Sequence, residues 1–173
     1  MKLAFKLPQT LVERAIAAYP WGPSGPYCHV EAVFDEWARP LIPAGMIHAG
    51  DPGGELCYSS TWGAPRKGCG FQNIKLTAPE WWSIDVGITP EEERAILAMA
   101  IRDNGKAYDW RGIAGFVFPP VPDDRHERFC SEECTRFVQR AGYFPSAVAV
   151  RTTPNGLAQL VETYFSTHGD FKK

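Results

Sequence analysis

The chain has 173 residues, of which 45% are hydrophobic and 22% are charged, and its formal net charge is −2. These values are typical of one soluble globular domain over residues 1–173, and they argue against nucleic acid or an anionic membrane surface as a partner. Glu13 and Arg14 interrupt the first apolar stretch, and no window is long enough to span a membrane. We therefore expect no signal peptide, no transmembrane segment and synthesis in the cytoplasm.

The first half of the chain is predicted to form strands. Residues 27–37 alternate, with Tyr27, His29, Glu31 and Val33 on one face and apolar side chains on the other. Three further segments have the composition of strands and are separated by turns rich in Gly or Pro: 55–62, 69–76 and 80–88. The simplest arrangement of these segments is an antiparallel meander.

Helices are predicted in the second half. Thr89 is suited to cap a helix, Pro90 to occupy its first turn and Gly105 to end it. An aromatic segment, 108–124, is predicted as a helical turn followed by a loop, and the last helix begins at Thr153. Strands followed by helices predict an α+β domain in which an antiparallel sheet packs against helices.

The stretch RFCSEECTRF, residues 128–137, opens a helix that ends at Gly142 and carries the candidate chemistry. Cys130 stands in its first turn, where unpaired backbone N–H groups and the helix dipole favour a thiolate. Cys134 follows one turn later on the apolar face and is interpreted as a packing residue. Glu132 would disfavour a neighbouring thiolate, so we expect its carboxylate to point away or to be paired.

The five cysteines do not predict a disulfide framework, because their number is odd, their spacing is irregular and no signal peptide precedes them. They are Cys28, Cys57, Cys69, Cys130 and Cys134. The ordinary interpretation of each is a reduced, buried, small hydrophobic residue. A reactive cysteine must therefore be identified by its surroundings.

A cysteine nucleophile needs a base, and His29 is the best placed of the four histidines. It lies on a predicted strand and shares a face with Glu31, which could orient the imidazole, stabilise its cation or line a substrate pocket. The other three lie in a glycine-rich loop, a polar loop and a polar tail: His48, His126 and His168. The alternative is that His29 is a structural hydrogen-bonding residue and Cys130 belongs to the core.

A zinc site is a lesser alternative. His126, Cys130 and Cys134 are spaced by four and could share a helical face if the helix began early. Zinc requires four tetrahedral ligands, or three and a water, and the sequence has no CxxC pair. The preferred interpretation therefore includes no metal and no cofactor.

Three segments together resemble the circularly permuted papain-like proteins of the NlpC type. CHVEAVF (28–34) resembles their histidine strand, and GKAYDWRGIAGFVFP (105–119) resembles their G-x-x-Y-D-x-x-G segment. RFCSEECTRFVQRAG (128–142) resembles their [FY]-C-S-E nucleophile helix. Histidine before cysteine is the permuted order, which the lecithin retinol acyltransferase group shares. The resemblance covers residues 27–142.

The resemblance implies a role for each matching residue. Cys130 would be the nucleophile, and His29 would be the base that later protonates the leaving group. Many family members carry a polar or acidic third residue on the next strand, but 55–62 offers no clear acid, only Glu55, Ser59 and Ser60. Glu31 is therefore the preferred third residue. Tyr108 and Asp109 match the family segment as structural or pocket residues.

The resemblance also implies the fold and the chemistry. The fold would be a half-barrel antiparallel sheet packed against helices, in a circularly permuted papain-like topology. The chemistry would be that of a cysteine peptidase, amidase, or ester or thioester hydrolase that works through an acyl-enzyme. Cell-wall peptides and lipids are the substrates it suggests.

A non-catalytic protein that kept the fold is the alternative to an enzyme. Small phage and bacterial members are the most similar, so the setting could be a phage-infected host cell or a virion. A structural or binding component of a virion would belong to this class, and the six tryptophans are compatible with a binding groove. The oligomeric state is not predicted.

Overall fold

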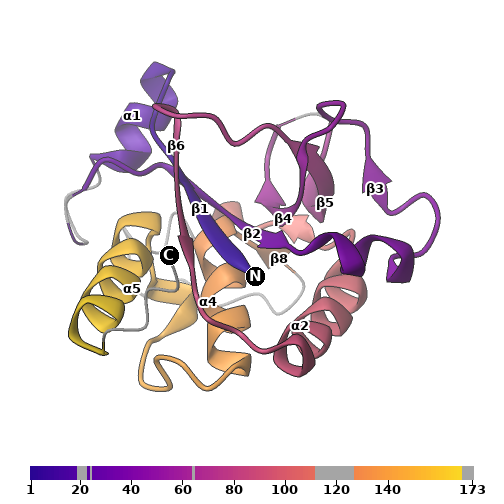
Figure 1. Ribbon diagram of the computed structural model, residues 1–173. Coiled ribbons are helices and arrows are strands. Elements are labelled where there is room, and N and C mark those ends of the chain that lie inside the picture. The colour runs from indigo at the N-terminus through magenta and orange to yellow at the C-terminus, as the bar shows by residue number, and fades with distance from the viewer. Residues whose placement is uncertain (19–22, 24, 64, 112–126, 169–173) are drawn as a thin grey trace.

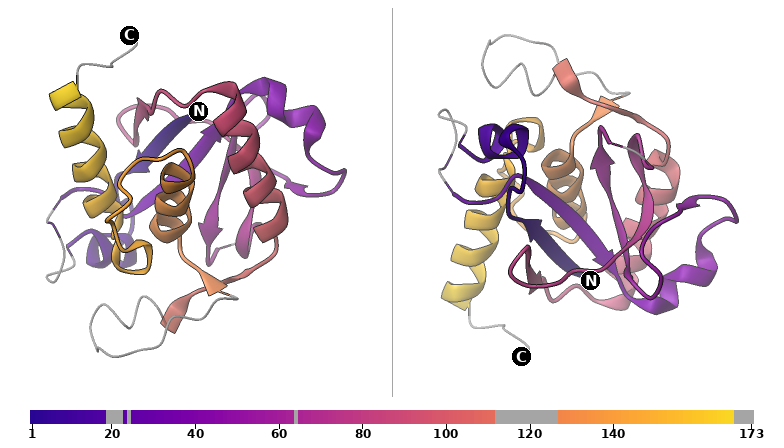
Figure 2. Two further views of the ribbon diagram at one scale, coloured as in Figure 1. Left: turned by 90° about the horizontal axis from the view of Figure 1, so that it is seen from below. Right: turned by 90° about the horizontal axis from the view of Figure 1, so that it is seen from above.

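A central sheet with helices on one face forms the body of the molecule (Figures 1 and 2). The computed structural model describes residues 1–18, 23, 25–63, 65–111 and 127–168. The combination of sheet and helices confirms the predicted α+β class. His126 and most of the predicted turn and loop segment 108–124 lie outside the described residues.

The central sheet has six strands. Their bounds are β1 Lys2–Lys6, β2 His29–Phe34, β3 Ile47–His48, β4 Glu55–Thr61, β5 Gly68–Ile74 and β6 Trp81–Asp85. They lie in the order β3-β5-β4-β2-β1-β6, so the four predicted strands are present as β2, β4, β5 and β6. A separate two-stranded sheet pairs β7, Ala107–Tyr108, with β8, Glu127–Arg128.

The prediction of an antiparallel sheet is wrong at one edge, where β3 pairs in parallel with β5. The chain reverses between β3 and β4 and again between β4 and β5, so β3 and β5 run in the same direction. Because β2 occupies the other edge of β4, β3 pairs beside β5 instead. The remaining pairs of the six-stranded sheet are antiparallel.

Strand β1 is not predicted from the sequence, and it breaks up the expected meander. It lies between β2 and β6 and pairs antiparallel with both. Leu3 and Phe5 are fully buried in the main core, while Ala4 packs with Val33 and Cys57 on the other face of the sheet. An N-terminal segment thus lies inside the sheet as the neighbour of the edge strand β6, and β6 pairs with it rather than with β5.

Four α-helices and two short 3₁₀ helices are described. Their bounds are α1 Leu11–Ala17, α2 Pro90–Asp103, α4 Cys130–Arg140, α5 Pro154–His168, η1 Glu36–Leu41 and η2 Ala149–Arg151. The last three α-helices are the predicted ones. Thr89 caps α2 as expected, and Gly142, just past the end of α4, has a φ of 86°, which glycine adopts readily.

Helix α4 lies between α5 and α2 on the covered face of the sheet (Figure 2). The ring of Phe137 lies 5.5 Å from that of Tyr58 on β4 and 6.4 Å from that of Phe34 on β2, measured between ring centroids. Cys134 is fully buried, which confirms its predicted position in the core. This packing fixes the N-terminal end of α4 beside β2, where Cys130 and His29 meet.

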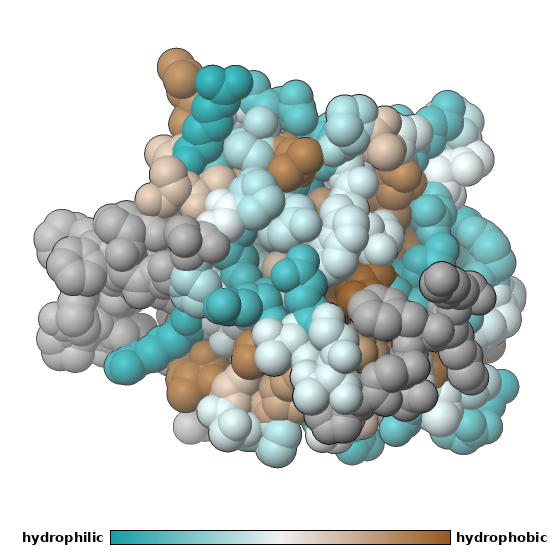
Figure 3. All heavy atoms as spheres, turned by 60° about the vertical axis from the view of Figure 1, so that its left-hand side comes forward, coloured by the Kyte–Doolittle hydropathy of each residue, from teal (hydrophilic) through white to brown (hydrophobic). Residues whose placement is uncertain are grey.

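The described part of the surface carries few large apolar side chains. Figure 3 shows hydrophobic residues in small groups among hydrophilic ones on one face of the molecule. Among the described residues, six large hydrophobic side chains are exposed: Leu11, Val12, Leu41, Trp62, Trp110 and Val148. In the part of the chain that the structure describes, no helix has both the length and the apolar character needed to cross a bilayer.

Candidate active site

Cys130 is the first residue of α4 and is only 4% exposed. Burial alone would raise the pKa of its thiol. The pKa is nevertheless lowered, because the charge of His29, a hydrogen bond with the His29 side chain and backbone hydrogen bonds at Val30 and Ser131 favour the thiolate. The helix N-terminus acts in the same direction.

His29 begins β2, and its imidazole contacts both Cys130 and Glu31. Nε2 lies 2.7 Å from Oε1 of Glu31. Burial would lower the pKa of the imidazole, but the charge of Cys130 and hydrogen bonds with Cys130 and Glu31 raise it to about 9. Because Glu31 engages Nε2, Nδ1 is the ring nitrogen left for Cys130. The two opposite shifts favour a thiolate–imidazolium pair over a neutral thiol and imidazole.

Glu31 lies two residues after His29 on the same strand face, as the alternation predicts, and is 1% exposed. Burial would raise the pKa of its carboxyl group, but the charge of Arg66 and the interactions with His29 lower it to about 2. A buried, ionised carboxylate thus stands behind the imidazole. The structure brings together all three residues that the sequence predicts for the site.

Arg66 is the residue of this cluster that the sequence analysis misses. It follows β4 in a segment predicted only as a turn, and it is 2% exposed. Nη1 donates to Glu31 Oε2 at 3.1 Å and to the Gly70 carbonyl at 3.0 Å, and Nη2 donates to Glu31 Oε1. A glutamate on a buried strand signals that some cation must pair with it, but no local pattern identifies which one.

The acidic residues beside Cys130 lie close to arginine side chains. Glu132 is fully buried and accepts hydrogen bonds from Arg136 Nε at 3.0 Å and Nη2 at 2.8 Å. The expectation that Glu132 is paired is therefore confirmed. Glu133 lies 3.5 Å from Arg128 Nε, and burial together with the charge of Asp103 raises the pKa of its carboxyl group to about 7.

The two serines on β4 are structural. Both are fully buried, and each hydroxyl donates to a backbone carbonyl: Ser59 to Val30 at 2.7 Å and Ser60 to Arg128 at 2.6 Å. These bonds tie β4 to β2 and to the segment that leads into α4. Neither serine hydrogen-bonds His29 in the described contacts, so Glu31 is the only one of the proposed third residues that contacts the imidazole.

A row of three aromatic side chains begins at Tyr108, which interacts electrostatically with Cys130. Burial and the charge of Cys130 raise the pKa of the Tyr108 phenol. The ring of Tyr108 lies 5.0 Å from that of Trp110, which lies 5.9 Å from that of Trp62. Trp62 is 50% exposed and Trp110 is 54% exposed, so this aromatic row leads from the site to the surface.

The zinc alternative depends on His126, which lies outside the described residues. Of its other two ligands, Cys130 interacts with His29, and burial raises the pKa of the Cys134 thiol well above its usual range. Within the described ranges, no group of three or more His, Cys, Asp or Glu side chains is arranged to hold a metal ion. Metal analysis of the purified protein would test the zinc alternative directly.

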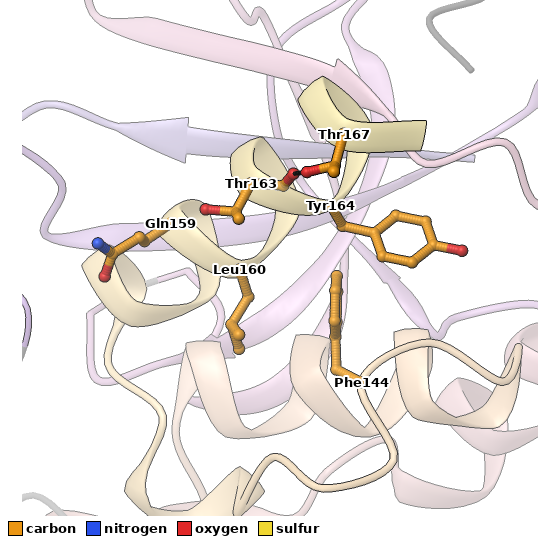
Figure 4. Close-up of a pocket in the computed structure, with 6 residues that line it drawn as sticks. All are labelled: Phe144, Gln159, Leu160, Thr163, Tyr164 and Thr167. Atoms are coloured by element: carbon orange, nitrogen blue, oxygen red, sulfur yellow. Dashed lines mark hydrogen bonds between the residues drawn. The ribbon is translucent and has the colours of Figure 1, made fainter. Parts of the chain in front are cut away.

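A pocket of about 380 Å³ lies between Phe144 and the outer side of α5 (Figure 4). Its lining is apolar and hydroxyl-bearing: Phe144, Gln159, Leu160, Thr163, Tyr164 and Thr167. None of these side chains is an acid, a histidine or a cysteine. The pocket therefore lacks the combination of thiol, imidazole and carboxylate that the Cys130 cluster contains.

Comparison with known proteins finds no matching family model, no matching curated protein and no matching solved structure. The site is therefore described by its own geometry: a thiol on a helix N-terminus, an imidazole on a strand and a buried carboxylate–guanidinium pair behind it.

Proposed function

We propose that the chain is a cysteine-dependent hydrolase of the circularly permuted papain-like type, with Cys130 as the nucleophile, His29 as the base and Glu31 as the residue that orients His29. The observation that carries this proposal is the contact series from Cys130 through His29 to Glu31, with a lowered thiol pKa and a raised imidazole pKa. Reactive cysteines are activated in this way. The permuted order is supported by β2 preceding α4 in the chain.

The proposed reaction begins with attack of the Cys130 thiolate on the carbonyl carbon of an amide, ester or thioester. The backbone N–H of Cys130, at the open end of α4, would donate to the developing oxyanion. The His29 imidazolium then gives its proton to the leaving group, which leaves an acyl group on the sulfur. Neutral His29 next takes a proton from water, whose oxygen attacks the acyl-enzyme and releases the acid.

The aromatic row of Tyr108, Trp110 and Trp62 supports a substrate with an apolar portion next to its scissile bond. Half-exposed indole rings bury apolar surface when a ligand covers them. Cell-wall peptides and lipids, the two substrate classes that the resemblance suggests, both contain such portions. The proposal therefore names the scissile bond, a carbonyl linked to nitrogen, oxygen or sulfur, and keeps both classes.

Thiol labelling and ester turnover test the proposal together. Iodoacetamide should alkylate Cys130 at neutral pH much faster than it alkylates Cys28, as measured by peptide mass spectrometry. The comparison is matched, since both residues are 4% exposed but burial raises the pKa of Cys28 to about 12. A nitrophenyl ester should acylate Cys130 with a burst of nitrophenol, which Cys130→Ala abolishes and Cys28→Ala preserves.

The opposite result would favour the non-catalytic alternative. If Cys130 is alkylated no faster than a free cysteine and no acyl adduct forms, the proposed nucleophile is inactive. The exposed Trp62–Trp110 pair would then be the feature to explain, as a contact surface of a structural or binding protein.

A further inference from the structure

A buried carboxylate without a partner does not stay ionised in a protein. Burial penalises the charged form, and an isolated buried glutamate takes up a proton instead. Glu31 is 1% exposed and depends on two partners for its charge, His29 and Arg66. His29 is itself titratable, so Arg66 is the only permanent cation of the three.

The guanidinium of Arg66 is held in a fixed orientation. Its two terminal nitrogens contact the two oxygens of Glu31, and Nη1 also donates to the carbonyl of Gly70 on β5. A Cβ atom at position 70 would lie 3.2 Å from Arg66 Cδ and 3.1 Å from Nε2 of His48, so glycine leaves the space in which the arginine lies. A residue from a turn is thus anchored on the central sheet.

We propose that Arg66 is a positioning residue of the Cys130–His29 pair and acts through Glu31, which its guanidinium keeps ionised and aligned with Nε2 of His29. This inference rests on the proposed function, because it assigns Arg66 a role in that same site. It extends the site by a fourth residue, which never contacts the substrate. The arginine sets the charge of the carboxylate, the carboxylate sets the charge of the imidazole, and the imidazole sets the charge of the thiol.

Loss of the Arg66 guanidinium should weaken the charged form of each of the other three residues in turn. Glu31 would then be protonated nearer to neutral pH, and His29 would lose the anion that stabilises its cation. The imidazolium would release its proton more readily, and Cys130 would lose the neighbouring cation that favours its thiolate. The pH at which half of Cys130 is thiolate should therefore rise.

The other titratable groups facing the cluster do not confuse this readout. Burial raises the pKa values of the Cys28, Cys57 and Cys134 thiols and of the Tyr108 phenol, so these groups stay neutral at neutral pH. The His48 side chain lies against Gly70 beside Arg66. A His48→Asn variant therefore belongs in the experiment.

The test is the rate of Cys130 alkylation by iodoacetamide between about pH 4 and pH 9, followed by peptide mass spectrometry. Arg66→Met should move the midpoint of the thiolate profile upward by about one unit or more, which slows alkylation about tenfold below the midpoint. Arg66→Lys keeps a cation and should recover part of the shift. His48→Asn should leave the profile in place.

Arg39→Met is the matched control. Arg39 also forms a two-nitrogen fork with a glutamate, through Nε at 2.8 Å and Nη2 at 2.9 Å from the oxygens of Glu36, but Glu36 is exposed. The Arg39→Met variant should leave the pH profile of Cys130 alkylation unchanged. Circular dichroism spectra establish that each compared variant is folded.

A second pair of variants serves if Arg66→Met does not fold with an unpaired Glu31. Glu31→Gln removes the buried charge, so adding Arg66→Met to it should change the thiolate midpoint little further, as expected when one residue acts through another. If adding Arg66→Met to the Glu31→Gln variant raises the thiolate midpoint by about one further unit, Arg66 does not act through Glu31 and the inference is overturned. The same holds if Arg66→Met leaves the wild-type profile unchanged.

These outcomes differ from failure of the proposed function. If the proposed function fails, wild-type Cys130 reacts like an ordinary thiol before any arginine is replaced. A wild-type Cys130 that reacts quickly, together with an Arg66→Met variant that reacts equally quickly, would overturn only the inference about Arg66.

Discussion

Two cysteines near the site show that electrostatics, and not exposure, sets thiol character in this protein. Cys28 and Cys130 are each 4% exposed. Burial and the nearby charge of Glu13 raise the pKa of Cys28 to about 12, whereas His29 lowers that of Cys130. The difference comes from one imidazole, whose own pKa is raised by the charge of Cys130 and by hydrogen bonds with Cys130 and Glu31.

The pair predicts a specific pH window for turnover. Nucleophilic attack needs the thiolate, and release of the leaving group needs the His29 imidazolium, whose pKa is about 9. We expect ester turnover to fall as the pH rises through about 9, while alkylation of Cys130, which needs no proton donor, stays high. Parallel pH profiles of the two reactions measure this. A parallel decline in both rates would contradict the role of His29 as an acid.

Glu133 is predicted to destabilise the protein at neutral and higher pH. Burial and the charge of Asp103 raise its pKa from 4.5 to about 7, so the folded state binds the proton more tightly than the unfolded state. Stability should therefore be lost as the pH rises from about 4.5 to about 7. Glu133→Gln removes this penalty but leaves Arg128 without that carboxylate, so we expect a net gain of about 1–2 kcal/mol at pH values above about 8.

Urea unfolding at about pH 5 and about pH 8 measures the Glu133 effect. The gain from Glu133→Gln should be much smaller at the lower pH. Glu132→Gln is the control, since Glu132 is equally buried but paired with Arg136, and its loss should destabilise the protein. An equal gain from Glu133→Gln at both pH values would show that its charge is not the cause.

The site could be predicted from the sequence as far as local signals reach. His29 and Glu31 share a strand face because side chains alternate, and Cys130 is identified by its helix start. Arg66 could not be predicted, since its role depends on a turn folding back over β5 to reach β2. A contact between segments this far apart in the chain produces no periodic pattern and no fixed residue spacing in the sequence.

At the level of elements, α2 shows how much stability a local signal encodes. The Thr89 hydroxyl accepts a hydrogen bond from the Glu92 backbone at 3.3 Å, and the Glu92 carboxylate accepts one from the Thr89 backbone at 2.8 Å. Thr89→Ala should lower the free energy of unfolding by about 1 kcal/mol. Urea unfolding tests this, with the exposed Thr77→Ala as control; equal effects from both would exclude the cap as the cause.

Helices with strong end signals are predictable, whereas short elements are not. Thr10 and Glu13 form the same kind of capping box at α1, but this helix has only seven residues and leaves Leu11 and Val12 exposed, so its apolar periodicity is weak. Strand β1 has five residues with a lysine at each end. Its identity as a strand comes from pairing with β2 and β6, which is a property of the folded chain.

At the scale of the whole molecule, α4 connects the site to the core. It begins at Cys130, and its later residues Cys134 and Phe137 are fully buried against β2 and β4. Two thiols one turn apart thus report on different events. Cys130 is expected to react in the native state, whereas Cys134 should react only after the helix separates from the sheet.

This arrangement predicts that the two labelling rates depend differently on urea. The rate at Cys134 should rise exponentially at low urea with the slope of global unfolding, while the rate at Cys130 stays nearly constant. Phe137→Leu, which thins the contact with Tyr58 and Phe34, should lower stability by about 1–2 kcal/mol and raise Cys134 labelling about 5- to 30-fold. Labelling of Cys130 should change far less.

Mass spectrometry of the two cysteine-containing peptides gives both rates in one experiment, and the exposed Val148→Ala is the control that should alter neither. If Cys134 is labelled as readily as Cys130 without urea, α4 opens locally and does not share the stability of the core. The Cys130–His29 contact would then be broken in the same openings, because Cys130 lies on α4 and moves away from β2 when the helix does. Rapid labelling at Cys134 would therefore contradict both a cooperative core and a fixed catalytic pair.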